Sequence, residues 1–425
     1  MIYLLSFTAS YGGTFWYADS VKSLNEVKFT AYPFGGELFL QLRDYRPYAP
    51  ASLHGDTYSL NVFRFYVRRN FGNLSLSIGD EPLAFGRGLS LFLSDDDKAL
   101  LEATLRGVHL GYSFLRAYAG VKRRWIYYSS DRDTLLLGGL YATPTFGPVE
   151  LGLNLSLYDL YGRSEGTGLL PGGYVNFPLG PFSFYLEGAY RYGYDINTYG
   201  RNDGYGIYGN AEYTTGPLVL GAELKDYYRV FQEFNLPSPA NGYGLLPTGG
   251  RDEMGGNVYL SYSTFSTELG RSYNHDGDIV MKYYAASYYR DIGPFTVKVG
   301  SHHLDWGKNL NERQAFLEVK YNAPFGVIAY GEYRRRPYKE EWEDQPYVSL
   351  TFIYGGLTVA LSGRYYALSK KADRVIEFSY DNFSFLRVYA SYGSFSGDVV
   401  CSAGVCRYEP PFTGIKLGLN LYFTM

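Results

Sequence analysis

Apolar and polar side chains alternate along most of this chain with a period of two residues. The clearest examples are VELGLNLSL (149–157) and IKLGLNLYF (415–423). Successive side chains of a β-strand point to opposite faces, so each such run predicts a strand with one apolar and one polar face. Helical spacing is found only over 95–105. The alternation therefore predicts an all-β protein.

The connections between these runs alternate between tight and long. The tight ones fall at 145–148, 178–181, 214–217, 264–266, 291–294, 322–325, 355–356 and 381–384. The longer ones fall at 159–172, 194–204, 229–253, 272–278, 302–312, 334–346, 367–372 and 394–412. A soluble sandwich has no reason to keep this order, whereas an outer-membrane barrel has short periplasmic turns and long extracellular loops. We expect a transmembrane antiparallel up-and-down β-barrel of about 22–24 strands, with both termini in the periplasm.

The composition agrees with a membrane barrel. Aromatic residues make up 19% of the 425 residues, with 47 Tyr among them, and the net charge is only -3. Tyr and Trp form girdles at the two interfaces of membrane barrels. The aromatic content argues against a disordered chain, and the balanced charge argues against a nucleic-acid partner.

The first residues, MIYLLSFTAS, resemble the second half of a signal peptide without its basic region. We therefore interpret 1–12 as the remnant of a signal peptide and 13–425 as one barrel domain in the bacterial cell outer membrane. The last strand ends in Tyr422-Phe423, similar to the aromatic end that barrel-assembly machinery reads. The expected partners are this machinery, the lipid bilayer, lipopolysaccharide, and an unknown solute or polymer.

The polar faces of the predicted strands define a charged lumen, because charges facing lipid cost a few kcal/mol each. The alternation shifts phase between Val62 and Phe63, which predicts a β-bulge after which Phe63, Phe65 and Val67 face lipid. Residues 79–88 break the alternation, and we hypothesise that they kink or fold inward to form a constriction. The lumen and constriction candidates are Arg64, Arg68, Asp80, Arg87, Glu187, Arg191, Glu223, Lys225, Glu318, Lys320, Glu332, Arg334 and Arg364.

The remaining cysteine and histidine groupings indicate structural roles more than chemical ones. Cys401 and Cys406 lie in the last external loop, where export permits a disulfide that holds the loop's shape; a redox-active pair is the alternative. His302, His303 and Asp305 are the nearest approach to a metal cluster. Adjacent strand residues point apart, so surface loop polarity is the better interpretation. No metal site and no cofactor are expected.

Three stretches resemble an uncharacterised family of Gram-negative outer-membrane β-barrel proteins, classed as a domain of unknown function. The first is GDEPLAFGRGL (79–89), followed by an Arg-Gly pair at 106–107, and the second is ELKDY (223–227). The third is CSAGVCRYEP (401–410). The chain departs from the family's pattern at Glu81-Pro82, where the family has Phe-Tyr. The resemblance implies location and fold, and it transfers no catalytic residue.

These observations favour an outer-membrane barrel that forms a hydrophilic passage for solute or polymer transport. The alternative is a structural or surface-anchoring barrel with a plugged lumen, whose external loops bind polysaccharide or protein partners. A third hypothesis, a barrel-embedded hydrolase, requires a Ser/His or paired-carboxylate site that the five histidines do not visibly supply. We therefore expect no enzymatic activity.

Overall fold

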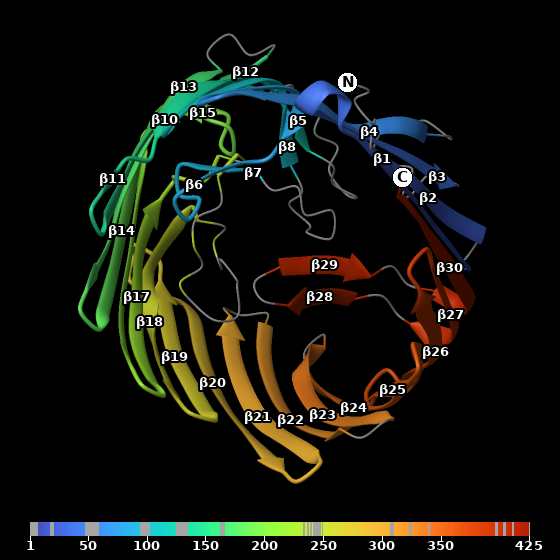
Figure 1. Cartoon of the computed structure of the whole chain (residues 1–425). Coiled ribbons are helices and arrows are strands. Elements are labelled where there is room, and N and C mark those ends of the chain that lie inside the picture. Colours follow the sequence, from blue (N-terminus) through green and yellow to red (C-terminus); the bar gives the residue numbers. More distant parts are fainter. Residues whose placement is uncertain are drawn as a thin grey trace.

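The computed structural model describes residues 7–17, 21–46, 59–93, 103–124, 135–161, 166–232, 234–235, 238, 240, 248, 250–306, 310–322, 325–338, 341–395, 398–402, 405–409 and 412–424. Twenty-four of its strands form one closed antiparallel barrel, seen end-on in Figure 1. Each strand pairs with its neighbours along the wall, and β1 pairs with β30 to close the ring. The predicted fold class and strand number are confirmed.

The wall consists of β1 (Phe7–Tyr17), β2 (Val21–Ala31), β3 (Gly36–Arg46), β4 (Ser59–Phe71), β5 (Leu74–Glu81), β8 (Ala103–Tyr112), β9 (Leu115–Arg124), β10 (Leu135–Ala142), β12 (Val149–Leu160), β13 (Thr167–Leu179), β14 (Phe182–Asp195), β16 (Gly204–Thr215), β17 (Leu218–Tyr228), β18 (Asp252–Tyr262), β19 (Phe265–Tyr273), β20 (Ile279–Ile292), β21 (Phe295–Trp306), β22 (Leu310–Asn322), β23 (Gly326–Tyr338), β24 (Glu341–Tyr354), β25 (Leu357–Tyr366), β26 (Lys371–Phe383), β27 (Leu386–Phe395) and β30 (Phe412–Thr424). The short strands β11 (Thr145–Phe146) and β15 (Gly200–Arg201) extend it. Two hairpins stand apart from the wall, β6 (Leu83–Phe85) with β7 (Leu91–Leu93) and β28 (Asp398–Ser402) with β29 (Val405–Glu409).

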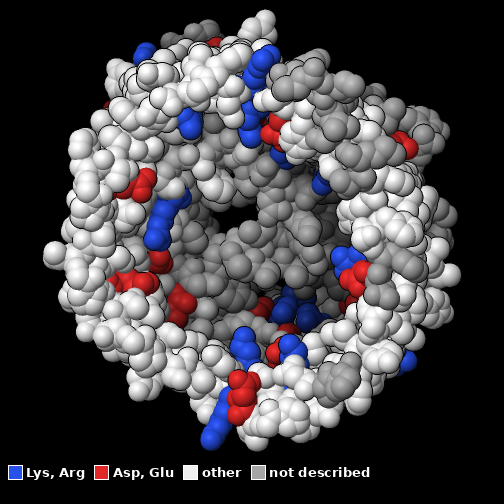
Figure 2. Space-filling view, in the orientation of Figure 1, with Lys and Arg blue, Asp and Glu red and all other residues white. Residues whose placement is uncertain are grey.

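The alternation of side chains gives the wall an apolar outer face and a polar inner face. The outward-facing Leu153 and Val348 are 69% and 65% exposed. Asn154 and Ser156, which alternate with leucines on β12, are buried inside. Figure 2 shows Lys, Arg, Asp and Glu around the inner rim of a central hollow. This is the arrangement of a barrel that crosses a membrane with strands. Among the described residues, no helix is long and apolar enough to span a membrane; the helix found there is the short 3-10 turn η1 (Pro33–Gly35).

The tight connections are hairpin turns at one end of the barrel. Gly147, Gly180, Gly216 and Gly293 have φ between 53° and 60°, a left-handed conformation that favours glycine. At the opposite end several strands run further than expected. Most of the predicted loops 302–312 and 334–346 is strand, because neighbouring backbones continue to pair beyond the apolar part of the wall.

Two predicted segments, the signal-peptide remnant 1–12 and the possible helix 95–105, include residues that lie in strands. Residues 7–12 belong to β1, and the signal-peptide boundary stays a prediction. Residues 103–105 of the possible helix begin β8, because they pair with β9. The rest of 95–105, apart from these three residues, lies outside the described residues.

A charge placed on the outer face of the wall should destabilise the barrel far more than the same charge placed inside. Val348 and Ser349 are consecutive in β24 and face lipid and lumen respectively. We expect Val348→Arg to lower the free energy of unfolding in lipid by about 2–4 kcal/mol, and Ser349→Arg to change it by less than about 1 kcal/mol. Urea titration of the protein in vesicles measures both; equal losses would contradict the assigned faces.

Candidate functional site

The stretch that breaks the alternation leaves the wall and folds into the barrel. β5 ends at Glu81, and the next residues form the hairpin β6–β7, which lies inside the ring of strands in Figure 1. We call residues 83–93 the inner hairpin. Its side chains Leu83, Phe85, Leu89 and Leu91 are at most 8% exposed. An apolar segment can be stable inside a polar lumen only if it is covered, so the surrounding residues must differ from the rest of the inner face.

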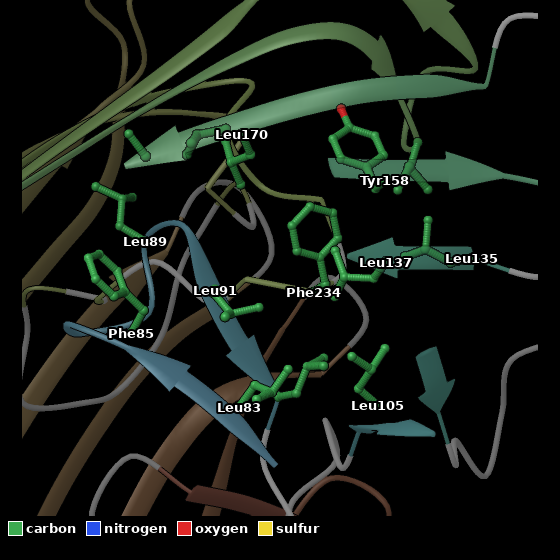
Figure 3. Close-up of a cluster of buried hydrophobic side chains, with 14 of the residues drawn as sticks. Leu83, Phe85, Leu89, Leu91, Leu105, Leu135, Leu137, Tyr158, Leu170 and Phe234 are labelled. Carbon is green, nitrogen blue, oxygen red and sulfur yellow. The ribbon is translucent and has the colours of Figure 1, made fainter. Parts of the chain in front are cut away.

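Part of the inner face is indeed apolar beside this hairpin. The residues packed around it include Leu105, Leu135, Leu137, Tyr158 and Leu170 from the wall (Figure 3). The connection between β17 and β18 contributes Phe234, whose carbonyl accepts a hydrogen bond of 2.8 Å from Phe92 N. Asn235 donates through Nδ2 to the Leu89 carbonyl at 2.6 Å. Two segments distant in sequence thus form one packed layer on one side of the lumen.

Glu187, on the inner face of β14, holds the tip of the inner hairpin. Its carboxylate accepts hydrogen bonds from Arg87 N at 2.8 Å, Leu89 N at 3.0 Å and the Tyr185 hydroxyl at 2.7 Å. Gly86 has φ 57°, and a Cβ there would lie 2.5 Å from the Tyr185 hydroxyl oxygen. The close approach therefore needs glycine at 86 and an acceptor at 187. Hydrogen bonds to an ionised acceptor are the stronger kind.

Arg87 directs its side chain toward the open part of the lumen. Its guanidinium donates to the Tyr208 hydroxyl at 2.7 Å and lies 3.5 Å from a Glu223 carboxylate oxygen. It also lies 4.9 Å from the ring centroid of Tyr185. The side chain keeps 44% exposure despite these contacts. Arg87 is therefore a partly neutralised cation available to a molecule in the lumen.

Asp80, the other residue predicted for the constriction, lies in the wall. It shares strand alternation with the outward-facing Ile78, and its carboxylate binds both Nε and Nη2 of Arg106, at 2.9 and 2.6 Å. It also accepts Phe65 N at 3.0 Å, just where the ladder between β4 and β5 ends at Tyr66 and Gly79. The carboxylate replaces the missing strand partner of β4, so Asp80 is a structural residue of the wall.

The predicted bulge is present in β4, where Gln41 and Leu42 of β3 pair with Arg64 and Val62 and skip Phe63. Phe63 is the residue whose direction differs from expectation: the Arg43 guanidinium carbon lies 3.7 Å from its ring centroid, and both side chains are buried. The extra residue of the bulge turns Phe63 inward instead of toward lipid.

The other arginine candidates of β4 lie inside. Arg64 lies 5.1 Å from the Phe39 ring. Arg68 is 41% exposed and pairs with Glu81 at 2.6 Å and Glu37 at 3.6 Å.

Two candidates are fully buried and position loops. Arg191 donates to the carbonyls of Arg229 and Asn202 at 2.7 and 2.8 Å, and Lys225 is paired with Glu253. Neither side chain is exposed, so neither reaches the lumen. Arg191 binds backbone carbonyls that would otherwise lack partners, and Lys225 neutralises the buried carboxylate of Glu253 in β18.

The remaining candidates face the lumen across from the inner hairpin. Glu332 lies 3.3 Å from Arg334 and 3.2 Å from Arg364, forming a mixed cluster whose cations are 16–18% exposed. Glu318 and Lys320 alternate with outward-facing Leu317 on β22 and therefore point inward. The passage thus has a packed side near β10–β16 and a charged, open side near β22–β25 (Figures 1 and 2).

The predicted histidine and cysteine groupings both lie in strands. His302 and His303 lie in β21 and not in a loop; His302 faces Glu312 at 3.1 Å, whereas His303 stacks on Tyr284. Within the described ranges, no three His, Cys, Asp or Glu side chains converge as metal ligands. Cys401 and Cys406 are directly opposite in the β28–β29 ladder, and their disulfide stays a prediction because their side chains lie outside the described residues.

A histidine in the connection between β19 and β20 contacts the loop ends of β16, β17 and β18. His275, between β19 and β20, contacts Asp252 through Nδ1 and Asp226 through Nε2 at 2.9 Å. Tyr205 lies 3.3 Å from Nε2, and the Tyr228 ring packs edge-on. Partial burial opposes protonation, but the hydrogen bonds and charges of the two carboxylates outweigh it and raise the pKa of His275 above its ordinary value.

Comparison with known proteins finds distant structural similarity. No family model matches the chain, and no curated protein matches it. The P pilus usher PapC translocation pore is 9% identical, with a TM-score of 0.46, covering 99% of both chains. The FrpB iron transporter of Neisseria meningitidis is 11% identical, with a TM-score of 0.44, covering 100% of this chain and 82% of that one. OccK1 of Pseudomonas aeruginosa is 10% identical, with a TM-score of 0.35, covering 99% of both.

Removing the Glu187 carboxylate should release the inner hairpin. Glu187→Ala leaves the buried Leu89 N–H without its acceptor and leaves Arg87 N with only the Tyr185 hydroxyl, so we expect the hairpin to lose about 1–3 kcal/mol of local stability. Hydrogen exchange of 83–93 should accelerate by at least about tenfold while the wall stays protected. Glu318→Ala is the control, because Glu318 lies across the lumen. Unchanged exchange in Glu187→Ala would contradict the anchoring role.

The His275 contact should depend on pH. Because its pKa is raised in the folded protein, the stabilisation is complete below the ordinary pKa of about 6.5 and is lost as pH rises through the raised value. We expect hydrogen exchange at 274–278 to accelerate between pH 6 and 9, after correction for intrinsic exchange. His275→Ala should exchange rapidly at both pH values; a variant that kept the wild-type pH dependence would refute the assignment.

Proposed function

We propose that the protein is a passage through the bacterial outer membrane for a hydrophilic solute or an extended polymer. The observation that carries this proposal is the division of the lumen into a packed side and a charged side. The inner hairpin narrows the barrel without removing the polar surface opposite it. The apolar outer face supports the membrane location, and a passage lined by ionised groups suits molecules that cross in hydrated form.

The charges of the passage are mixed, which favours polar cargo over one strongly selected ion. Arg87 and Arg68 are exposed cations, at 44% and 41%. Each has a carboxylate neighbour, Glu223 or Glu81. Glu332 with Arg334 and Arg364 repeats this pairing on the other side. Paired charges keep the surface hydrated while limiting the net field along the passage.

The second candidate is a surface-anchoring barrel with a plugged lumen, presenting its external loops to polysaccharide or protein partners. It is favoured by the tight packing of the inner hairpin, since Leu91 is fully buried and Phe85 and Leu89 are 1% exposed. The hairpin β28–β29 also projects across the ring in Figure 1. In this case the charged side would be closed to solutes, which separates the two candidates experimentally.

The remaining assignments belong to the same proposal. We assign lipopolysaccharide and the bilayer as surroundings of the outer face, and barrel-assembly machinery as the partner of the last strand during biogenesis. The uncharacterised outer-membrane family remains the proposed relationship, on the three stretches named above. No catalytic residue is assigned.

Solute entry into vesicles tests the passage directly. Full-length protein reconstituted in liposomes should admit small sugars and show a size cut-off, measured as isotonic swelling. Protein-free and heat-denatured preparations are the controls. Absence of swelling with correctly folded, heat-modifiable protein would exclude the open passage and favour the plugged barrel.

Reversing the charge at the inner hairpin should change ion preference. Arg87→Glu places an anion beside Glu223, so the reversal potential across a tenfold KCl gradient should shift toward cation preference by about 10 mV or more. Arg290→Glu, on the outer face near the turn end of β20, makes the same charge change away from the lumen. Equal shifts in both variants, or no shift in Arg87→Glu, would remove Arg87 from the passage.

A further inference from the structure

A groove of about 1120 Å³ crosses the outer face of the barrel from β22 to β30. Its lining is largely apolar: Leu317, Val319, Val348, Leu361 and Ile376 are among the residues that border it. These side chains belong to the outward-facing set, because Leu317, Val348, Leu361 and Ile376 are all at least 43% exposed on the lipid side. The groove is therefore distinct from the lumen.

The groove exists because small residues stand where large ones would fit. Leu317 pairs with Gly331, Gly331 with Val348, and Val348 with Gly363. A Cβ on Gly331 would meet nothing within 4 Å, and one on Gly363 would meet only the Asp373 carbonyl at 3.6 Å. Neither backbone has the positive φ that requires glycine. The missing side chains thus leave space that the wall itself does not need.

The groove runs obliquely from mid-wall to the loop end of the barrel. Leu317 lies in the middle of β22, whereas Ser394 and Thr413 lie next to the loop ends of β27 and β30. Arg374 lies between these levels, opposite Gly363 on one side and Ser394 on the other. Its side chain is exposed, and in the described part of the chain no carboxylate pairs with it. One end is therefore apolar and the other carries a cation and hydroxyls.

Further cations lie at the same rim. The guanidinium carbons of Arg313 and Arg335 are each 5.5 Å from the Trp342 ring centroid. Arg335 also lies 3.4 Å from Asp344. With Arg374, three arginines lie at this rim of the outer face, together with the carboxylate of Asp344. Arginine beside an interfacial aromatic ring binds phosphate in a bidentate fashion better than lysine does.

We propose that this groove binds a phosphorylated, multiply acylated lipid of the outer leaflet. An acyl chain lies along Gly331 and Gly363, and a headgroup phosphate lies at Arg374. The inference rests on the proposed outer-membrane location and is independent of whether the lumen is open. Because the surrounding lipid is equally apolar, the preference for this lipid comes from close packing in the groove and from the phosphate contact, not from the hydrophobic effect.

The test uses the full-length protein in detergent, titrated with the phosphorylated lipid anchor of lipopolysaccharide and with its dephosphorylated form. Native mass spectrometry counts bound lipids. We expect the phosphorylated lipid to bind at least about tenfold more tightly, a difference of about 1.4 kcal/mol. Arg374→Gln should abolish that preference. Arg290→Gln, an exposed outward arginine near the opposite rim, is the matched control and should leave it intact.

A second variant tests the groove itself. Gly331→Leu fills the space without touching the cation, so it should weaken binding of both lipid forms while heat-modifiability reports correct folding. Vesicle swelling should be unchanged in Arg374→Gln, which separates failure of this inference from failure of the passage. Equal binding of the two lipid forms would overturn the proposal. A Gly331→Leu variant that binds lipid normally would also overturn it. A third contradicting result would be a wild-type protein that forms a dimer, with Gly331→Leu converting it to a monomer while lipid binding stays unchanged.

Discussion

Every part of this structure depends on the closure of one hydrogen-bonded sheet. In lipid there is no water to satisfy backbone N–H and C=O groups, so a strand without two neighbours is costly. The pairing of β1 with β30, with Tyr11 opposite Leu421, removes the last free edges of the wall. Where β4 and β5 separate, the ladder fails locally, and the Asp80 carboxylate accepts the exposed Phe65 amide. The same constraint explains the ring and the Asp80–Arg106 pair in its wall.

Closure also fixes what the lumen can contain. A closed barrel of 24 strands encloses a wide interior, and the inner hairpin with the connection around Phe234 occupies part of it. That layer is held by apolar packing and by Glu187, whose buried carboxylate is stable because three donors surround it. Among the described residues, the opposite side has no such cover and keeps its charged groups. A packed side and a hydrated side are thus two consequences of one inserted segment.

The wall was predictable from sequence because each strand carries its own two-residue period. The directions of particular residues were less so, since they depend on register: Phe63 turns inward at a bulge, and Asp80 shares the outward set with Ile78. The anchor at Glu187 lies about a hundred residues from the hairpin it holds, and only pairing of the strands brings them together. The outer groove is invisible in sequence because its glycines lie on different strands.

We infer that a water-filled route remains beside the inner hairpin. Single-channel recording of the full-length protein in a planar lipid bilayer tests it most directly. We expect stable, ohmic conductance steps that become larger when the Glu187 anchor is removed. A folded, inserted protein with no conductance, and none gained on releasing the hairpin, would contradict it.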